Sequence, residues 1–149
     1  MPDKLVIKVE GAKEIEAAMR ALGVAAANRI ARSALNRAST PIVRRARELA
    51  PTPGDPNDPY ATGGLKKAIS KRLRRQRPGS SEQIILIGIE RPRSRIAHLL
   101  EFGAAHMASE PFLRPALDEA HGQTLQVMQQ ALSAGVDREI KKLEVKRSK

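Results

Sequence analysis

Both phenylalanines of the chain lie in one stretch, residues 96–118, which reads IAHLLEFGAAHMASEPFLRPALD. The rest of the chain offers one tyrosine and no tryptophan, so few other large rings are available to fill an interior. Because a buried aromatic ring dominates the packing around it, we expect Phe102 and Phe112 to mark the core. Gly103 follows an apolar run, which favours a tight turn or a left-handed cap. Pro115 favours the start of a helix at that residue.

Two charged residues of this stretch stand where a charge is costly. Glu101 lies within an apolar run, and a buried carboxylate needs a partner. Arg114 lies between Pro111 and Pro115, which restrict its direction. The sequence therefore predicts an ion pair between Glu101 and Arg114 that holds the loop 103–111 against the core. The alternative is that both residues contact an adjacent subunit.

Four short blocks of the sequence form a pattern. Residues 99–103 read LLEFG and residues 110–117 read EPFLRPAL, while upstream residues 46–51 read ARELAP and residues 62–69 read TGGLKKAI. In this order and spacing the blocks resemble a family of tailed-phage structural proteins, the small neck or tail-completion proteins that join head and tail. That family usually has Thr after the Gly of LLEFG, where this chain has Ala104. The positions that match the motif are Thr62, Gly63, Leu65, Glu101, Phe102, Gly103, Pro111, Phe112, Leu113, Arg114 and Pro115.

The resemblance implies an α+β fold, in which a small antiparallel sheet with a β-hairpin packs against a long N-terminal helix and a C-terminal helix. It implies a subunit without catalytic activity that assembles with copies of itself as a ring around the DNA channel. Its other partners would be the adjacent head-completion or connector protein and the tail-terminator or tail-tube protein, with non-specific contact to packaged DNA. Its place would be the neck or tail end of the virion, after assembly in the host cytoplasm.

Helical periodicity appears in three segments. Residues 12–22 place apolar side chains on one face, and residues 24–50 repeat small or apolar side chains every three or four positions, with most arginines away from that stripe. Pro41 removes a backbone donor, so we expect one long helix kinked there; a new helix capped by Thr40 is the alternative. A C-terminal helix is expected from Pro115 to Leu132, closed by Gly135.

The remaining segments predict strands and loops. Residues 4–9 favour a strand, residues 77–81 favour a turn, and the proline-rich residues 51–60 favour a surface loop. Residues 65–75 are ambiguous between a short helix and a strand, and we expect a turn at 63–68 followed by a strand over 69–75. Residues 83–89 (QIILIGI) are apolar on both faces, which predicts a central, covered strand. We expect a single domain over residues 1–136 and a basic C-terminal tail over residues 137–149.

The net charge of +11 is concentrated in one part of the chain. Residues 63–97 hold ten basic and two acidic side chains. Such a concentration favours a surface for an anionic partner, either packaged DNA or an acidic protein, although a solvated hairpin would show the same pattern. The candidate interface residues are Lys66, Lys67, Lys71, Arg72, Arg74, Arg75, Arg77, Arg91, Arg93 and Arg95.

Patterns typical of enzymes and cofactor sites are missing from the sequence. There is no cysteine, and His98, His106 and His121 are not at metal-ligand spacing. No serine has the surroundings of a nucleophile elbow, and Gly63-Gly64 is not followed by a phosphate-loop lysine. We therefore expect no catalytic residues, no metal, no cofactor and no membrane span. The alternative function is a free basic nucleic-acid-binding protein, against which stand the few aromatics and the lack of a helix-turn-helix or zinc signature.

Overall fold

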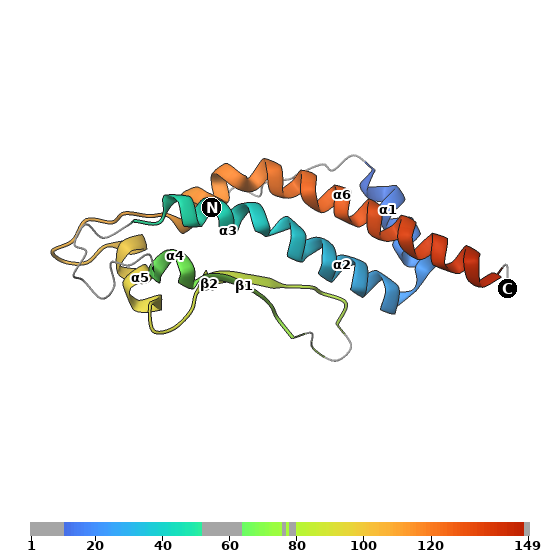
Figure 1. Cartoon of the computed structure of the whole chain (residues 1–149), viewed down its shortest axis with the longest axis horizontal. Helices are drawn as coiled ribbons and strands as arrows, with labels where there is room; N and C mark the ends of the chain where they lie inside the picture. The colour runs from blue at the N-terminus through green and yellow to red at the C-terminus, as the bar shows by residue number, and fades with distance from the viewer. Residues whose placement is uncertain (1–10, 52–63, 76, 78–79, 148–149) are drawn as a thin grey trace.

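The computed structural model describes residues 11–51, 64–75, 77 and 80–147. The molecule is elongated, and helices α2, α3 and α6 and the hairpin lie roughly along the long axis (Figure 1). The bent pair of helices α2 and α3 lies between the C-terminal helix α6 on one side and a β-hairpin on the other (Figure 1). The expected strand at 4–9, Thr62, Gly63 and almost all of the loop 51–60 lie outside the described residues.

The N-terminal helices follow the predicted periodicity. Helix α1 (Ala12–Leu22) ends at Gly23, whose φ of 83° lies in the region that favours glycine. Helix α2 (Val24–Ala38) and helix α3 (Thr40–Leu49) join at Ser39 as one bent helix. The backbone N–H of Ser39 still donates to Leu35 and that of Val43 to Ser39, so helical bonding continues through the bend while Pro41 supplies none. The prediction of one long, kinked helix is confirmed.

Helix α6 (Leu113–Arg147) is longer than the sequence indicated, because it starts two residues before Pro115 and continues far beyond Leu132. The expectation that Gly135 closes this helix is wrong. Gly135 is buried in mid-helix, where a Cβ atom would lie 2.7 Å from Cγ2 of Ile30 in α2. The glycine therefore allows close approach of two helices. The residues of the expected tail that follow it, as far as Arg147, are helical.

The hairpin consists of strand β1 (Ile69–Leu73) and strand β2 (Ile85–Ile89), preceded by the short helix α4 (Gly64–Ala68). The strands are antiparallel, with Ile69 opposite Ile89 and Leu73 opposite Ile85, so both are shorter than predicted. The expectation that β2 is covered on both faces is wrong. Within the described residues the sheet has two strands, and Leu86 of β2 is 49% exposed. An apolar run on both faces thus marks a surface here, because no third described strand or helix covers it.

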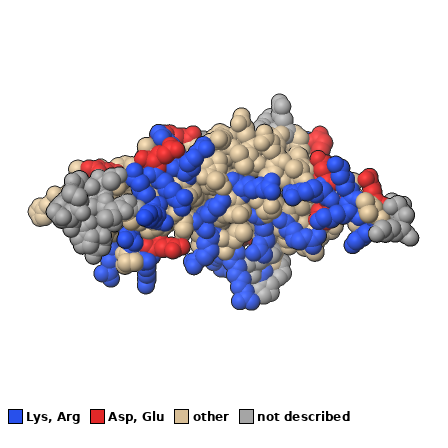
Figure 2. Space-filling model, viewed as in Figure 1, with Lys and Arg blue, Asp and Glu red and all other residues tan. Residues whose placement is uncertain are grey.

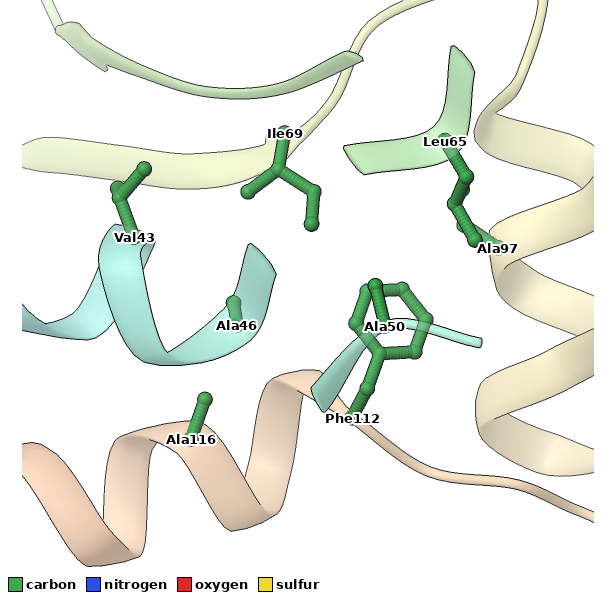
Figure 3. Close-up of a cluster of buried hydrophobic side chains, with 8 residues drawn as sticks. All are labelled: Val43, Ala46, Ala50, Leu65, Ile69, Ala97, Phe112 and Ala116. Atoms are coloured by element: carbon green, nitrogen blue, oxygen red, sulfur yellow. The ribbon is translucent and has the colours of Figure 1, made fainter. Parts of the chain in front are cut away.

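Helix α5 (Ser94–Phe102) follows the hairpin and completes the core. The ring of Phe112, which is fully buried, lies among small and branched side chains from α3, α4, β1, α5 and α6 (Figure 3). The alanines of α3 and α6 let the two helices approach closely on one side of this ring (Figure 3). The cluster is Val43, Ala46, Ala50, Leu65, Ile69, Ala97, Phe112 and Ala116. These elements confirm the predicted α+β fold, with its small antiparallel sheet, long bent helix and C-terminal helix.

Candidate functional site

The motif stretch ties α5 to α6 through the side chain of Glu101. The backbone N–H groups of Phe112 and Leu113 donate to Oε2 of Glu101 at 2.9 and 3.0 Å, and that of Arg114 donates to Oε1 at 3.0 Å. These groups belong to the start of α6, where backbone donors have no partner within the helix. The predicted ion pair between Glu101 and the guanidinium of Arg114 is therefore wrong. The carboxylate binds the backbone of the helix start instead, as a cap supplied by another helix.

The ionisation of Glu101 follows from these bonds. Burial is the largest influence and raises the pKa of its carboxyl. The three backbone hydrogen bonds and the positive charge of Arg114 act the other way and together outweigh burial. The pKa of Glu101 consequently lies below the ordinary glutamate value, so the residue is a carboxylate at neutral pH.

The loop between α5 and α6 depends on Gly103. Its φ of 77° lies in the left-handed range, and a Cβ atom there would lie 3.0 Å from the carbonyl oxygen of Met107. The expected turn at Gly103 is confirmed. The backbone N–H of Glu110 then donates to the carbonyl of Leu100 at 2.7 Å, which returns the chain to the end of α5. Pro111 is exposed, and Leu113 packs half-buried against the core.

Phe102 does not lie in the core. Its side chain is 61% exposed, with its ring centroid 4.8 Å from that of His98 one turn earlier. Because Glu101 points toward the start of α6, its neighbour Phe102 is rotated by about 100° around the helix and faces outward. The expectation that both phenylalanines fill the interior is wrong for this one. Leu99 and Leu117 of the same motif are also exposed.

An apolar groove lies beside these exposed residues. Its volume is about 560 Å³, and it is open to solvent between β2, α5 and the first turns of α6. One wall is formed by the half-buried isoleucines of β2, and another by His98 and Phe102 of α5. The edge of β2 that faces away from β1 pairs with no strand in the described part of the chain. We name the surface formed by Ile85, Ile87, Ile89, His98, Phe102 and Leu117 the motif groove.

The basic residues predicted from the sequence do not form one surface. Lys71 faces the bent helix, where its Nζ donates to the carbonyl of Asn36 and, at 2.8 Å, to the hydroxyl of Thr40. Arg93 covers Gly64, since a Cβ atom at that glycine would lie 2.5 Å from the guanidinium. Both residues therefore hold the fold together. Lys66 is half-buried on α4. The remaining predicted residues, Lys67, Arg72, Arg74, Arg75, Arg77, Arg91 and Arg95, are exposed.

The strand register separates these exposed residues into two groups. Arg74, Arg75 and Arg77 follow the end of β1 at Leu73, whereas Arg91 and Arg95 follow the end of β2 at Ile89, which pairs with Ile69. Four strand steps, about 13 Å, lie between the two ends of the paired ladder. The hairpin tip and the connector before α5 are thus separate basic surfaces.

The structure adds basic residues that the sequence reasoning left out of the site. Exposed arginines of α2 and α3 lie on the side of the bent helix that is left open between α6 and β1. Figure 2 shows Lys and Arg side chains gathered over α2, α3 and the hairpin, with few acidic side chains between them. The arginines within residues 24–50 could have been recognised in the sequence as a basic side of a helix. That β1 lies next to this side could not be inferred from them.

Within the described residues, no group of three or more histidine, cysteine, aspartate or glutamate side chains could hold a metal ion. Across the same part of the chain, no helix combines the length and the hydropathy that a membrane span requires. Comparison with known proteins adds no family: no protein-family model, no curated protein and no solved structure matches the chain. What the site can do therefore has to be argued from its own geometry.

Proposed function

We propose that the chain is a non-enzymatic structural subunit of a tailed-phage particle, which joins head and tail as a ring around the DNA channel. It would act in the neck or at the tail end of the virion, in contact with copies of itself and with the head-side and tail-side proteins next to it. The observation that carries the proposal is the exposed apolar side of the motif stretch, which forms a groove beside a strand edge that no described strand pairs with.

The residues of the motif divide into two groups. Glu101, Gly103 and Phe112 fold the stretch, through the cap, the turn and the core. Phe102 and Leu117 contribute little to the core, since the side chains of both remain at least half exposed beside the groove. Contiguous apolar surface of this kind usually marks a protein–protein contact. A strand edge offers a partner main-chain hydrogen bonds in addition to the apolar wall.

A second apolar surface lies at the other end of the molecule. Ile140 and Leu143 are 40% and 49% exposed on the last turns of α6, which extend beyond α2 (Figure 1). Leu117 and Ile140 are separated by 23 helical residues, which corresponds to about 35 Å along the axis. Two different apolar surfaces at opposite ends of one subunit favour head-to-tail contacts, and such contacts close into rings when the rotation between subunits permits.

The test compares particles assembled by the genome that encodes the chain. Without the chain, we expect filled heads and separate tails in electron micrographs. Phe102→Asp should give the same result, because a charge in the motif groove opposes burial against a partner. The control is Gln126→Asp, which introduces the same charge at an exposed position of α6 between the two apolar surfaces and should leave joined particles.

Both variant proteins should be checked for an unchanged thermal midpoint, so that a lost contact is distinguished from a lost fold. Joined particles in the absence of the chain would contradict the proposal. So would purified particles in which mass spectrometry finds no copy of it.

A further inference from the structure

The bent helix α2–α3 presents a row of arginines along its open side. Arg32, Arg37, Arg44 and Arg47 are exposed along α2 and α3, between the flank that contacts α6 and the flank that contacts β1. Arg32 and Arg47 are 15 residues apart, so the row covers about 22 Å of helix.

The two flanks of this row are fixed by contacts to neighbouring elements. Toward α6, the guanidinium of Arg44 donates to the side chain of Gln123 at 3.0 Å. Toward β1, the guanidinium of Arg47 donates to the carbonyl oxygen of Ile69 at 2.8 Å, and Lys71 reaches Thr40. Arg44 and Arg47, at one end of the row, are therefore held by contacts to α6 and β1.

The end of the hairpin adds further arginines. Lys71 faces the bent helix, so Arg72 lies on the opposite face of the sheet and is not part of the row, while Arg74 and Arg75 follow the end of β1 toward the hairpin tip. Figure 2 shows the resulting concentration of Lys and Arg over these elements. We name the set Arg32, Arg37, Arg44, Arg47, Arg74 and Arg75 the basic face.

Acidic side chains do not neutralise this surface. Among the described residues, the only acid within ion-pair distance of the basic face is Glu48, 4.0 Å from Arg44, and Glu48 is also paired with Arg45 at 2.9 Å. Clustered cations without acidic partners produce a positive potential that attracts polyanions. Arginine in particular presents a planar fork of donors that matches phosphate oxygens.

We propose that the basic face binds the phosphate backbone of double-stranded DNA without reading its sequence. A duplex carries one charge per about 1.7 Å of its axis, so along the 22 Å row it presents roughly a dozen phosphates. This inference does not depend on the place of the chain in a phage particle, because it follows from the charge and shape of one surface.

The shape of the basic face favours contact with the backbone of a duplex over sequence readout in the major groove and over the binding of single strands. Sequence readout requires a helix or ribbon that enters the major groove, and α2–α3 is flanked by α6 on one side and β1 on the other. Single strands are bound by stacking on aromatic side chains. The one exposed aromatic ring among the described residues, Phe102, lies in the motif groove.

The test is an anisotropy titration of a labelled duplex of mixed sequence, about 30 base pairs long, at several salt concentrations. The face variant carries Arg32→Gln, Arg37→Gln and Arg75→Gln, and the side chains of these three arginines make no hydrogen bond or ion pair with a described residue. The matched control carries Lys13→Gln, Arg91→Gln and Arg95→Gln, which remove the same charge from exposed positions elsewhere. Each lost phosphate contact lowers the slope of log K against log salt by about 0.9.

We expect the face variant to bind at least about tenfold more weakly near 0.1 M salt, with a slope smaller by about 3, and the control to change less than about twofold. Equal losses in both variants would overturn the proposal, since binding would then follow total charge. So would a wild-type protein that does not bind the duplex, or one that binds a single strand of the same length more tightly. Competition by polyglutamate at equal charge would identify an acidic protein surface as the partner instead.

Discussion

The carboxylate of Glu101 accepts the backbone N–H of Phe112 at 2.9 Å, so the end of one helix caps the start of another. The bond joins residues eleven positions apart and closes the loop that separates α5 from α6. It also fixes where Phe112 enters the core, because the bonded N–H and the buried ring belong to the same residue. The motif groove is built on this connection, since α5 supplies one of its walls and α6 another.

Replacement of Glu101 should show how much this cap adds to the free energy of unfolding. Glu101→Ala leaves three N–H groups at the start of α6 without their acceptor and should lower the free energy of unfolding by about 1–3 kcal/mol. Urea denaturation measures the change. Glu110→Ala is the matched control, because Glu110 is exposed and its described contact uses its backbone N–H; its effect should stay within about 0.5 kcal/mol. Equal losses in the two variants would show that the carboxylate of Glu101 does not act as a cap.

The stabilisation by Glu101 should depend on pH. The folded-state pKa of this carboxyl is depressed, so its contribution is fully present above the ordinary glutamate pKa and is lost as pH falls through the folded-state value. The difference in stability between wild type and Glu101→Gln should therefore be constant near neutral pH and shrink on acidification below the ordinary glutamate pKa. Denaturation curves over this range test it. A difference that grows toward low pH would contradict the assigned direction of the shift.

The two phenylalanines should respond differently to truncation. Phe112→Ala removes a fully buried ring and should cost about 3–5 kcal/mol, a large part of the stability of a domain of this size. Phe102→Ala removes a ring that is mostly exposed and should cost less than about 1 kcal/mol, while weakening contacts to a partner. Thermal unfolding of both variants provides the comparison. If Phe112→Ala leaves the midpoint unchanged within a degree or two, the ring does not pack in the core as described.

Two glycines of α6 should respond to alanine in opposite directions. Gly135→Ala forces a Cβ against Ile30 and should destabilise the protein by about 1–3 kcal/mol. Gly122→Ala meets no atom within 4 Å on an exposed helical position and should stabilise by about 0.5–1 kcal/mol. Adding Ile30→Ala to Gly135→Ala should cost less than the sum of the single changes, because the new methyl group then occupies vacated space. Strict additivity would mean that α2 and α6 do not meet at this point.

The hairpin charges should matter for assembly and not for folding. Arg72→Glu, Arg74→Glu and Arg75→Glu together should leave the thermal midpoint nearly unchanged, because exposed charges contribute little to stability. In particles we expect the same triple variant to block head–tail joining, which micrographs would show as separate filled heads and tails. Infectious, joined particles would mean that the hairpin is a solvated arm.

Local patterns were sufficient for most of the secondary structure. The helix 12–22, the bend near Pro41 and the turn at Gly103 were all predicted, as was a hairpin formed by the segments that became β1 and β2. Each depends on interactions within a few residues: apolar side chains at helical spacing, the missing donor of proline, or the freedom of glycine at positive φ. These local interactions do not depend on how the rest of the chain packs. The α+β class was what the resemblance implied, and the structure confirms it.

The contacts within the site could not be predicted from local patterns, because they depend on which elements pack against each residue. Glu101 was recognised as a charge in need of a partner, but only the position of α6 decides that the partner is backbone. The charges of Lys71 and Arg93 suggested a basic surface. In the structure, however, the side chain of Lys71 bonds to Thr40 and that of Arg93 packs against Gly64.

By itself, then, the sequence determined α1, the bent helix α2–α3 and the two strands of the hairpin, because hydrogen bonds and periodicity within an element are local. The tertiary structure decided what each face of an element meets. Gly135 supports a helix crossing instead of a helix end because Ile30 approaches it from α2, more than a hundred residues earlier. Phe102 is exposed because no described element lies beyond α5 to cover it, whereas Phe112 is buried because five elements converge on it. Burial and pairing are properties of neighbours, and neighbours are set by packing.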